Sequence, residues 1–378
     1  MEEVRHPFRS YVVVSREQLA RNYRNVCSAV GPGIEVLGVV KADAYGHGAI
    51  EVARVLAAEG VKWLGVSSVE EGVHLRCAGI DARILVMAGF LRYERDALIE
   101  YNLTPAVHNL EDVKDLDALA RASGRPLPYH LKIDTGMSRL GTCAGAAEIV
   151  AAVCGAPHAH MEGLMTHFAS AADYSTSQTD QQIASFTRIY GELGAADIRP
   201  RFVHMSSTNA IGYARRQAWG NMVRAGHALY GYVSPARGNA PAQILNVAPA
   251  LTWKAKILAV KHIAEGTLVG YGGTFRAARA MRIGVLGAGY ADGIFHRLSN
   301  RGKVIAAGQL TPILGTVSMD LTTIDLSHTE ALGPGDDVTL LGAEDGVSLD
   351  AQQIARTAGT ISYNILCGIS SRVRRVYV

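Results

Sequence analysis

The chain has 378 residues, of which 48% are hydrophobic and 19% are charged, and its formal net charge is +3. This composition is typical of a globular protein, and the length suffices for a barrel of about 250 residues with a smaller second domain. Basic residues are spread along the chain and no apolar run reaches the roughly 20 residues of a membrane span, so we expect neither nucleic-acid binding nor membrane insertion.

The N-terminal residues and the cysteines predict a cytoplasmic protein. Residues 1–10 are charged and mixed, without the apolar core of a signal peptide. The cysteines are scattered and lack the C-x-x-C spacing of metal or redox sites. They are Cys27, Cys77, Cys143, Cys154 and Cys367. We expect them to be reduced and structural, as is usual in the cytosol.

Up to about residue 245, short β-branched or apolar runs alternate with longer stretches of helical periodicity. The predicted strands are residues 36–41, 63–67, 84–88, 104–108, 129–134, 162–167, 202–205 and 222–225. Residues 49–58 and 110–122 are predicted amphipathic helices, and Asn109 is a capping residue before the second. Eight strand–helix repeats favour a parallel (β/α)8 TIM barrel over a doubly wound open sheet, which is the main alternative.

After Pro249 the pattern changes to short strand-like runs between Gly-rich or Pro-containing turns. The predicted strands are residues 251–263, 281–286, 303–307, 321–325, 338–341 and 372–378, with one helix at 350–358. The predicted fold class is therefore α/β, an N-terminal (β/α)8 TIM barrel followed by a mostly β C-terminal domain. The predicted boundaries are an N-terminal segment 1–10 that packs with the C-terminal domain, a barrel 11–245 and a C-terminal β domain 246–378.

Reactive groups in such barrels lie at the carboxyl ends of the strands. The predicted strand ends carry Lys41, Asp134 with the loop to Arg139, His167, the run 204–208, and Arg224 with Gly226. One lysine, one histidine and two arginines around a common centre would suit an anionic, phosphate-bearing ligand.

Each of these side chains also has a simpler interpretation. Lys41 ends an apolar strand, where a poorly solvated amine has a lowered pKa and can form a Schiff base, but where it can also extend into water. Arg224 can form a structural salt bridge, and His167 can be a hydrogen-bonded core histidine. Gly226 can be a turn residue or part of a phosphate-binding backbone. These residues alone leave the alternatives open. No metal-binding cluster is present in the sequence, so no metal is expected.

Several motifs resemble the alanine racemase family. Residues 39–48, Val-Val-Lys-Ala-Asp-Ala-Tyr-Gly-His-Gly, resemble its pyridoxal-phosphate attachment signature, which is long and specific. Further similar segments cover essentially the whole chain, at residues 132–141, 166–168, 221–226, 228–231, 270–272, 289–293, 318–320 and 360–363.

The resemblance implies an enzyme that interconverts L- and D-alanine with pyridoxal 5'-phosphate as cofactor, by a two-base mechanism, and supplies D-alanine for cell-wall peptidoglycan. It also implies a head-to-tail homodimer in which the C-terminal domain of one subunit completes the active site of the other. Lys41 matches the Schiff-base lysine and Tyr271 the opposing catalytic tyrosine. Arg224 and His167, as neighbouring cations, would then lower the pKa of the tyrosine.

The resemblance assigns further residues to the cofactor and the substrate. Arg224 matches the arginine that faces the pyridine nitrogen, and His167 is its neighbour. The phosphate site corresponds to Tyr45, Thr208, the backbone of Gly226 and His227, and Tyr363. The substrate carboxylate corresponds to Arg139 and the backbone N–H of Met319, and the substrate entry to Tyr290 and Tyr363. Lys132 matches a lysine that is often carbamylated in the family.

Two residues depart from the family pattern. Thr208 stands where a serine is usual and keeps the hydroxyl, and His227 stands where an aliphatic residue is usual. The run 204–208 also departs from the usual sequence, so this loop is the weakest part of the resemblance.

Three other functions are compatible with parts of the sequence. A racemase of broader or different specificity, for serine or longer amino acids, is the nearest, although Tyr290 and Tyr363 crowd the substrate and favour alanine. A non-catalytic pyridoxal-phosphate-binding protein would lack the second domain. A related decarboxylase would carry a cysteine in the role of Tyr271.

Overall fold

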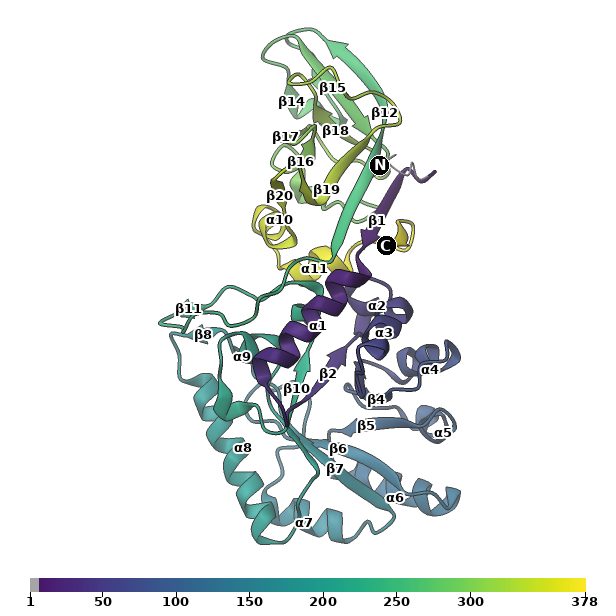
Figure 1. Cartoon of the computed structure of the whole chain (residues 1–378), viewed down its shortest axis with the longest axis vertical. Coiled ribbons are helices and arrows are strands. Elements are labelled where there is room, and N and C mark those ends of the chain that lie inside the picture. The colour runs from purple at the N-terminus through teal and green to yellow at the C-terminus, as the bar shows by residue number, and fades with distance from the viewer. Residues whose placement is uncertain (1–6) are drawn as a thin grey trace. The chain divides into compact units, whose positions relative to one another are not determined.

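The computed structural model describes residues 7–378 and divides them into two units (Figure 1). The barrel unit contains residues 19–44 and 49–248. The β unit contains the described residues up to 18, the segment 45–48 and residues 249–378. Residues 1–6 of the predicted N-terminal segment lie outside the described residues.

Eight parallel strands form the barrel unit, in the order β10-β2-β3-β4-β5-β6-β7-β9. They are β2 (Glu35–Val39), β3 (Trp63–Val66), β4 (Arg83–Val86), β5 (Leu103–Val107), β6 (Leu127–Lys132), β7 (Ala159–Met165), β9 (Phe202–His204) and β10 (Met222–Ala225). A parallel bridge between Ser207 and Arg224 brings the two ends of this order together, so the barrel is nearly closed. The predicted TIM barrel is confirmed, and the open sheet is excluded.

The helices of the barrel unit lie outside its strands (Figure 1). They are α1 (Arg16–Val30), which starts in the β unit, α3 (Ala49–Ala58), α4 (Val69–Cys77), α5 (Arg95–Glu100), α6 (Leu110–Ser123), α7 (Ala146–Cys154), α8 (Gln178–Ala195) and α9 (Thr208–Gly212). The predicted cap of α6 is confirmed, because the Asn109 side chain accepts a hydrogen bond from Asp112 N at 2.8 Å. No helix of residues 7–378 is both long and apolar enough to cross a membrane.

A nine-stranded sheet forms the β unit, in the order β20-β19-β16-β17-β18-β15-β12-β1-β21. Its strands are β1 (Ser10–Val14), β12 (Leu251–Ile263), β15 (Met281–Leu286), β16 (Lys303–Ala306), β17 (Gln309–Leu314), β18 (Thr322–Asp325), β19 (Asp337–Glu344), β20 (Val347–Leu349) and β21 (Arg374–Tyr377). Two helices accompany it, α10 (Ala351–Ala358) and α11 (Ser362–Cys367). The C-terminal domain is mostly β, as predicted.

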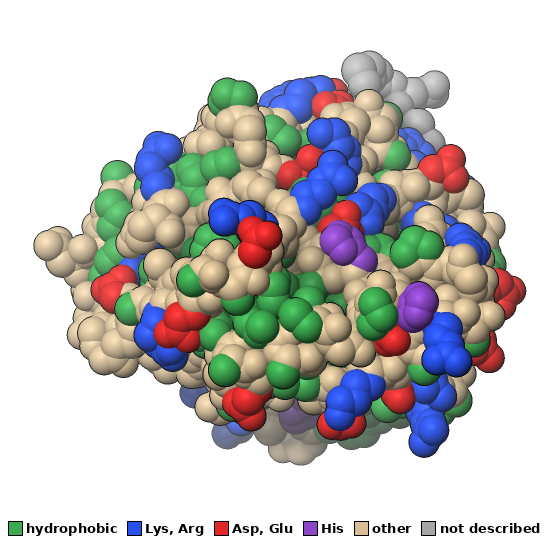
Figure 2. Space-filling view, turned by 90° about the horizontal axis from the view of Figure 1, so that it is seen from below, with side chains coloured by type: hydrophobic (Ala, Val, Ile, Leu, Met, Phe, Trp, Pro, Cys, Tyr) green, Lys and Arg blue, Asp and Glu red, His purple; other side chains and the backbone are tan. Residues whose placement is uncertain are grey.

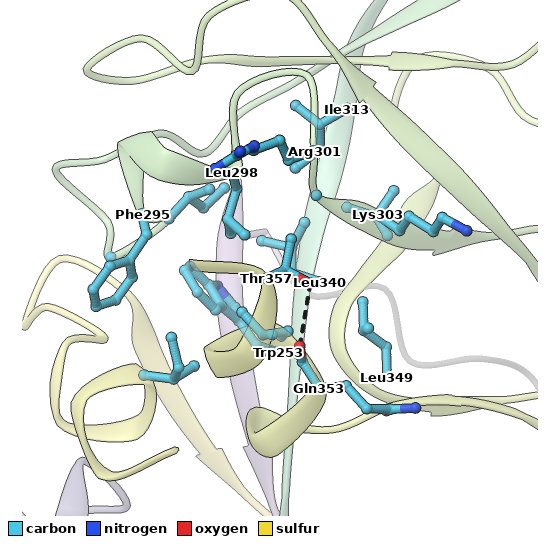
Figure 3. A pocket seen from close by; sticks show the side chains of 16 residues that line it. Trp253, Phe295, Leu298, Arg301, Lys303, Ile313, Leu340, Leu349, Gln353 and Thr357 are labelled. Atoms are coloured by element: carbon cyan, nitrogen blue, oxygen red, sulfur yellow. Dashed lines mark hydrogen bonds between the residues drawn. The ribbon is translucent and has the colours of Figure 1, made fainter. Parts of the chain in front are cut away.

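A cavity of about 240 Å³ lies within the β unit (Figure 3). Its wall is largely apolar and includes Trp253, Phe295, Leu298 and Leu340. The predicted catalytic, cofactor and substrate residues do not line this cavity. On the face in Figure 2, acidic and basic side chains are interspersed around a hydrophobic area, in keeping with the small net charge.

Candidate active site

Lys41 follows β2 and begins a left-handed helical turn. The N–H of Val40 still donates to Gly65 O of β3 at 2.8 Å, and the parallel ladder ends there. Residues 42–45 then have φ between 51° and 55°, although none of them is glycine. A left-handed conformation costs about 1–2 kcal/mol for each such residue, so this turn is strained. This turn could not be predicted from the sequence, because an Ala-Asp-Ala-Tyr run carries no glycine or asparagine signal.

Hydrogen bonds from distant residues stabilise this turn. The Glu71 carboxylate accepts from Ala42 N at 2.7 Å and from Ser67 N, at the end of β3, at 2.6 Å. Asp43 accepts from Ala49 N at 2.7 Å, and the Tyr230 hydroxyl donates to Val39 O at 2.8 Å. These contacts hold the backbone on both sides of Lys41 in one conformation.

Positive charges of the barrel unit converge on Lys132, at the end of β6. Burial, together with the charges of Arg224, Arg139 and Lys41, lowers the pKa of Lys132 to about 8. Asp134 opposes this effect. No described residue accepts a hydrogen bond from the Lys132 ammonium. The charges of Arg224, Arg139 and Lys41, which come from three different predicted strand ends, thus act on one buried amine.

Arg224 is buried without an acidic partner. Its two terminal nitrogens donate to the carbonyl oxygens of Thr166, His204 and Met205, at 2.8–3.0 Å. They also contact His204 Nδ1 at 2.9 Å and His167 Nδ1 at 3.2 Å. No carboxylate of residues 7–378 lies within 4.0 Å of it, so the salt-bridge interpretation is wrong. Its Nε–H is the one donor of the side chain that no described protein group accepts.

His167 is a neutral histidine. Burial and the charge of Arg224 lower its pKa well below the ordinary range, and its Nδ1 is an acceptor because a guanidinium only donates. The expectation that His167 is a cation is therefore wrong, and Arg224 is the permanent charge of the pair.

The predicted phosphate residues fall into two groups. In the barrel unit, the Thr208 hydroxyl oxygen accepts from Gly226 N at 3.1 Å and from Ala228 N at 3.2 Å, and His227 between them is buried. In the β unit, the rings of Tyr45 and Tyr363 are 5.9 Å apart. The threonine that replaces the usual serine thus organises the backbone around His227.

The predicted substrate-side residues belong to the β unit. Tyr290 N donates to Ser318 O at 2.9 Å and Ala291 N donates to Met319 O at 3.0 Å, so the loops of Tyr290 and Met319 are joined. A side chain at Gly289 would overlap the carbonyl oxygens of both Ser318 and Met319, so this close approach requires glycine. Tyr271 is 75% exposed and Met319 is 53% exposed.

Two neighbours of the site residues, Glu71 and His204, were not predicted from the sequence. Glu71 carries no motif, and its contact with Ala42 bridges 29 positions. His204 lies in the run 204–208 but received no role of its own, although it contacts Arg224. A signal for His204 was its place at a predicted strand end. No local signal marked Glu71.

Known protein families match the N-terminal and C-terminal parts of the chain separately. Models of the N-terminal and C-terminal domains of alanine racemase match residues 14–235 and 250–377. The chain belongs to the alanine racemase family. The alanine racemase of Carboxydothermus hydrogenoformans is 39% identical over 365 residues, which cover 97% of this chain and 98% of the relative. That of Thermodesulfovibrio yellowstonii is 38% identical, over 91% and 90% of the two chains.

Solved structures of alanine racemases have the same fold. The enzyme from Streptomyces lavendulae superimposes with a TM-score of 0.91 at 31% identity, over 99% of this chain and 98% of that chain. The enzyme from Bartonella henselae, with covalently bound pyridoxal phosphate, gives 0.87 at 26% identity, over 98% and 100%. The predicted family is confirmed, and the chain is an amino-acid racemase.

Proposed function

We propose that this member of the alanine racemase family interconverts L- and D-alanine with pyridoxal 5'-phosphate bound covalently to Lys41. The observation that carries the proposal is Lys41 at the carboxyl end of β2, in the cationic centre that contains Lys132 and Arg224. When bound, the cofactor withdraws electrons from the α-carbon of the amino acid and makes its proton removable. The relatives named alanine racemase support alanine as the substrate.

The residues of the chain fit this cofactor. Arg224 has an Nε–H to donate to the pyridine nitrogen, and a guanidinium donates without giving up its proton. The phosphate would be bound by the Thr208 hydroxyl and the backbone of Gly226 and His227, and by Tyr45 and Tyr363 of the β unit. A buried guanidinium without an acidic partner, and a Thr208 hydroxyl whose proton no described residue accepts, are donors that suit an anionic ligand.

Lys41 and Tyr271 would act as bases on opposite faces of the substrate, one removing the α-proton and the other returning one. Tyr271 is largely exposed in a single chain. A proton-transfer group works in a site from which water is excluded, so another surface must cover this phenol. We therefore propose a homodimer in which Tyr271 completes the site of the partner subunit.

The substrate carboxylate would be bound by Arg139 and by the backbone N–H of Met319. This N–H donates no hydrogen bond to a described residue. We also propose that Lys132 is carbamylated. Its lowered pKa provides the neutral amine that reacts with carbon dioxide, and the product would place a negative charge beside Arg139. A ¹³C NMR signal of a carbamate after incubation with [¹³C]bicarbonate, absent from Lys132→Gln, is expected. No signal in the wild type would contradict this part.

Specificity for alanine is proposed from Tyr290 and Tyr363, whose side chains would crowd a larger substrate. Chiral analysis of products from a panel of L-amino acids tests the proposed function. We expect D-alanine to form at least tenfold faster than D-serine or any longer product. A faster reaction with serine would favour the broader racemase. We further propose that the reaction takes place in the cytoplasm and that D-alanine is used for peptidoglycan.

A further inference from the structure

Three buried side chains form a hydrogen-bonded chain inside the barrel unit. His130 of β6 contacts His204 of β9, with Nδ1 and Nε2 2.8 Å apart. His204 Nδ1 in turn contacts Arg224 of β10 at 2.9 Å. His130 and His204 are fully buried, and Arg224 is 3% exposed. His130 lies on the side of His204 away from Arg224, and nothing in the proposed function uses it.

Arg224 and His130 contact opposite ring nitrogens of His204, and together they select one arrangement of protons. A guanidinium has donors and no acceptor, so the contact with Arg224 favours His204 Nδ1 as the acceptor and the His204 proton on Nε2. That proton points at His130 Nδ1, which must therefore accept as well. The proton of His130 is then on Nε2, a buried atom with no hydrogen-bond partner among the described residues.

The unpaired Nε2–H of His130 is a consequence of this arrangement of protons on the two histidines. If His130 instead donated from Nδ1, His204 would carry its proton on Nδ1 and oppose the Arg224 N–H. A buried unpaired polar group is costly and calls for a reason. Here the unpaired Nε2–H of His130 belongs to the arrangement in which His204 Nδ1 accepts a hydrogen bond from the buried Arg224.

The histidines are neutral as well as oriented. Burial lowers the pKa of His130 to about 3, and the charges of Arg83 and Arg224 contribute. Burial and the charge of Arg224 lower the pKa of His204 well below the ordinary range. The positive charge of the chain therefore stays on Arg224.

The interior of the barrel leaves room for the His130 ring. Gly163 of β7 lies between β6 and β9 in the sheet, in register with His130, and a Cβ on it would overlap the imidazole. Trp63 and Phe202 flank the ring, with centroids 5.3 and 5.9 Å away. Trp63 comes from β3, which neighbours none of the other strands involved, so these rings meet across the barrel interior.

We infer that His130 is a positioning residue which, by accepting the Nε2 proton of His204, fixes the tautomer that holds Arg224 in place. The inference rests on the proposed function, in which Arg224 faces the cofactor's pyridine nitrogen. The alternative is that His130 only fills space between Trp63 and Phe202.

Two substitutions separate these roles. His130→Phe keeps an aromatic ring between Trp63 and Phe202 but removes the acceptor. His130→Asn loses ring volume but can keep an acceptor at the place of Nδ1. We expect kcat/KM for alanine in the cofactor-loaded full chain to fall about 10- to 100-fold in His130→Phe, because the His204 hydrogen bond to the charged Arg224 is lost with the tautomer, and less than about threefold in His130→Asn. A space-filling role predicts the opposite order, which would overturn the inference.

A spectroscopic measurement tests the chain without activity. In ¹⁵N-histidine-labelled, cofactor-loaded protein, we expect His130 and His204 of the wild type to be neutral with the proton on Nε2, and His204 to lose this fixed tautomer in His130→Phe. A proton on Nδ1 of either histidine in the wild type would overturn the inference. If no form racemises alanine, the proposed function fails, whereas the NMR result still decides the role of His130.

Gly163→Ala provides the same test if His130→Phe does not fold. Its Cβ must displace the His130 ring, and Gly163 has no left-handed backbone that alanine would strain. Gly65→Ala is the matched control, because the atoms nearest to its Cβ would belong to the flexible side chains of Leu37 and Met87. We expect a changed His204 tautomer in Gly163→Ala and an unchanged one in Gly65→Ala. A wild-type spectrum from Gly163→Ala would contradict the inference.

Discussion

Lys41 is the residue on which the proposed chemistry depends. It follows the last ladder hydrogen bond of β2 and precedes a strained turn, so its backbone has one conformation. Borohydride reduction of the purified, cofactor-loaded protein should fix pyridoxal phosphate to the peptide that contains Lys41. Peptide mapping by mass spectrometry measures this. Modification of another lysine, such as Lys132, would contradict the assignment.

Buried histidines make stability depend on pH. Burial lowers the pKa of His108 to about 4 and of His130 to about 3, and it also lowers the pKa values of His167 and His204. In the unfolded chain these histidines titrate near 6.5. Below that pH the unfolded chain binds protons that the folded chain does not, so the free energy of unfolding falls as the pH drops from 6.5 towards 4.

The dependence of the free energy of unfolding on pH can be assigned to single histidines. Each fully neutral histidine contributes up to about 1.4 kcal/mol per pH unit in this range. Urea unfolding at pH 7, 6 and 5 should show a slope smaller by about this amount in His130→Asn than in the wild type. His160→Asn, at an exposed position of β7, is the control and should keep the wild-type slope. Equal slopes in all three proteins would show that His130 is charged in the folded state.

At the scale of elements, the left-handed turn after β2 depends on Glu71 of α4. Glu71→Ala leaves the N–H groups of Ala42 and Ser67 without their acceptor, which should lower the free energy of unfolding by about 1–3 kcal/mol. The fraction of cofactor fixed by borohydride should fall with it. Glu70→Ala, on an exposed side chain of the same helical turn, should change neither measurement. An unaffected Glu71→Ala would show that the turn is stable without this carboxylate.

Periodic elements could be predicted from the sequence, and elements that depend on distant partners could not. All eight barrel strands and the long strand β12 lie where the alternation of residues placed them. Strand β1 was not predicted, because its partners lie 237–245 residues away in β12 and 363 residues away in β21. Strand β17 contains Pro312, which argues against a strand, and tolerates it at the end of its pairing with β16.

The same distinction applies to the residues of the candidate site. The strand-end rule pointed to Lys41, Arg139 and Arg224, and the charges of all three act on Lys132, which only the resemblance pointed to. The charge of His167 and the partners of Arg224 depend on burial and on strands far apart in sequence. Only the folded chain determines these.

At the scale of the whole molecule, the proposed homodimer makes each site from two chains. Lys41→Ala lacks the covalent cofactor residue and Tyr271→Phe lacks the opposing phenol. A mixed dimer of these two variants would contain one site with both residues intact. When subunits exchange at random, half of the dimers are mixed and each has one active site. Mixing the variants should therefore restore up to about a quarter of the wild-type activity. Subunit exchange followed by native mass spectrometry is the control. Exchange without recovered activity would mean that each site is built from one chain.

The central claim is that Lys41 and Tyr271 serve opposite faces of one substrate. Exchange of the α-hydrogen for deuterium, followed in D2O by NMR and chiral analysis, measures each face separately. For Tyr271→Phe with bound cofactor, we expect racemisation to fall by at least about 10²-fold, the lower end of a general base's contribution, while exchange continues from the one enantiomer that presents its proton to Lys41. An equal loss of exchange from L- and D-alanine would contradict the two-base account.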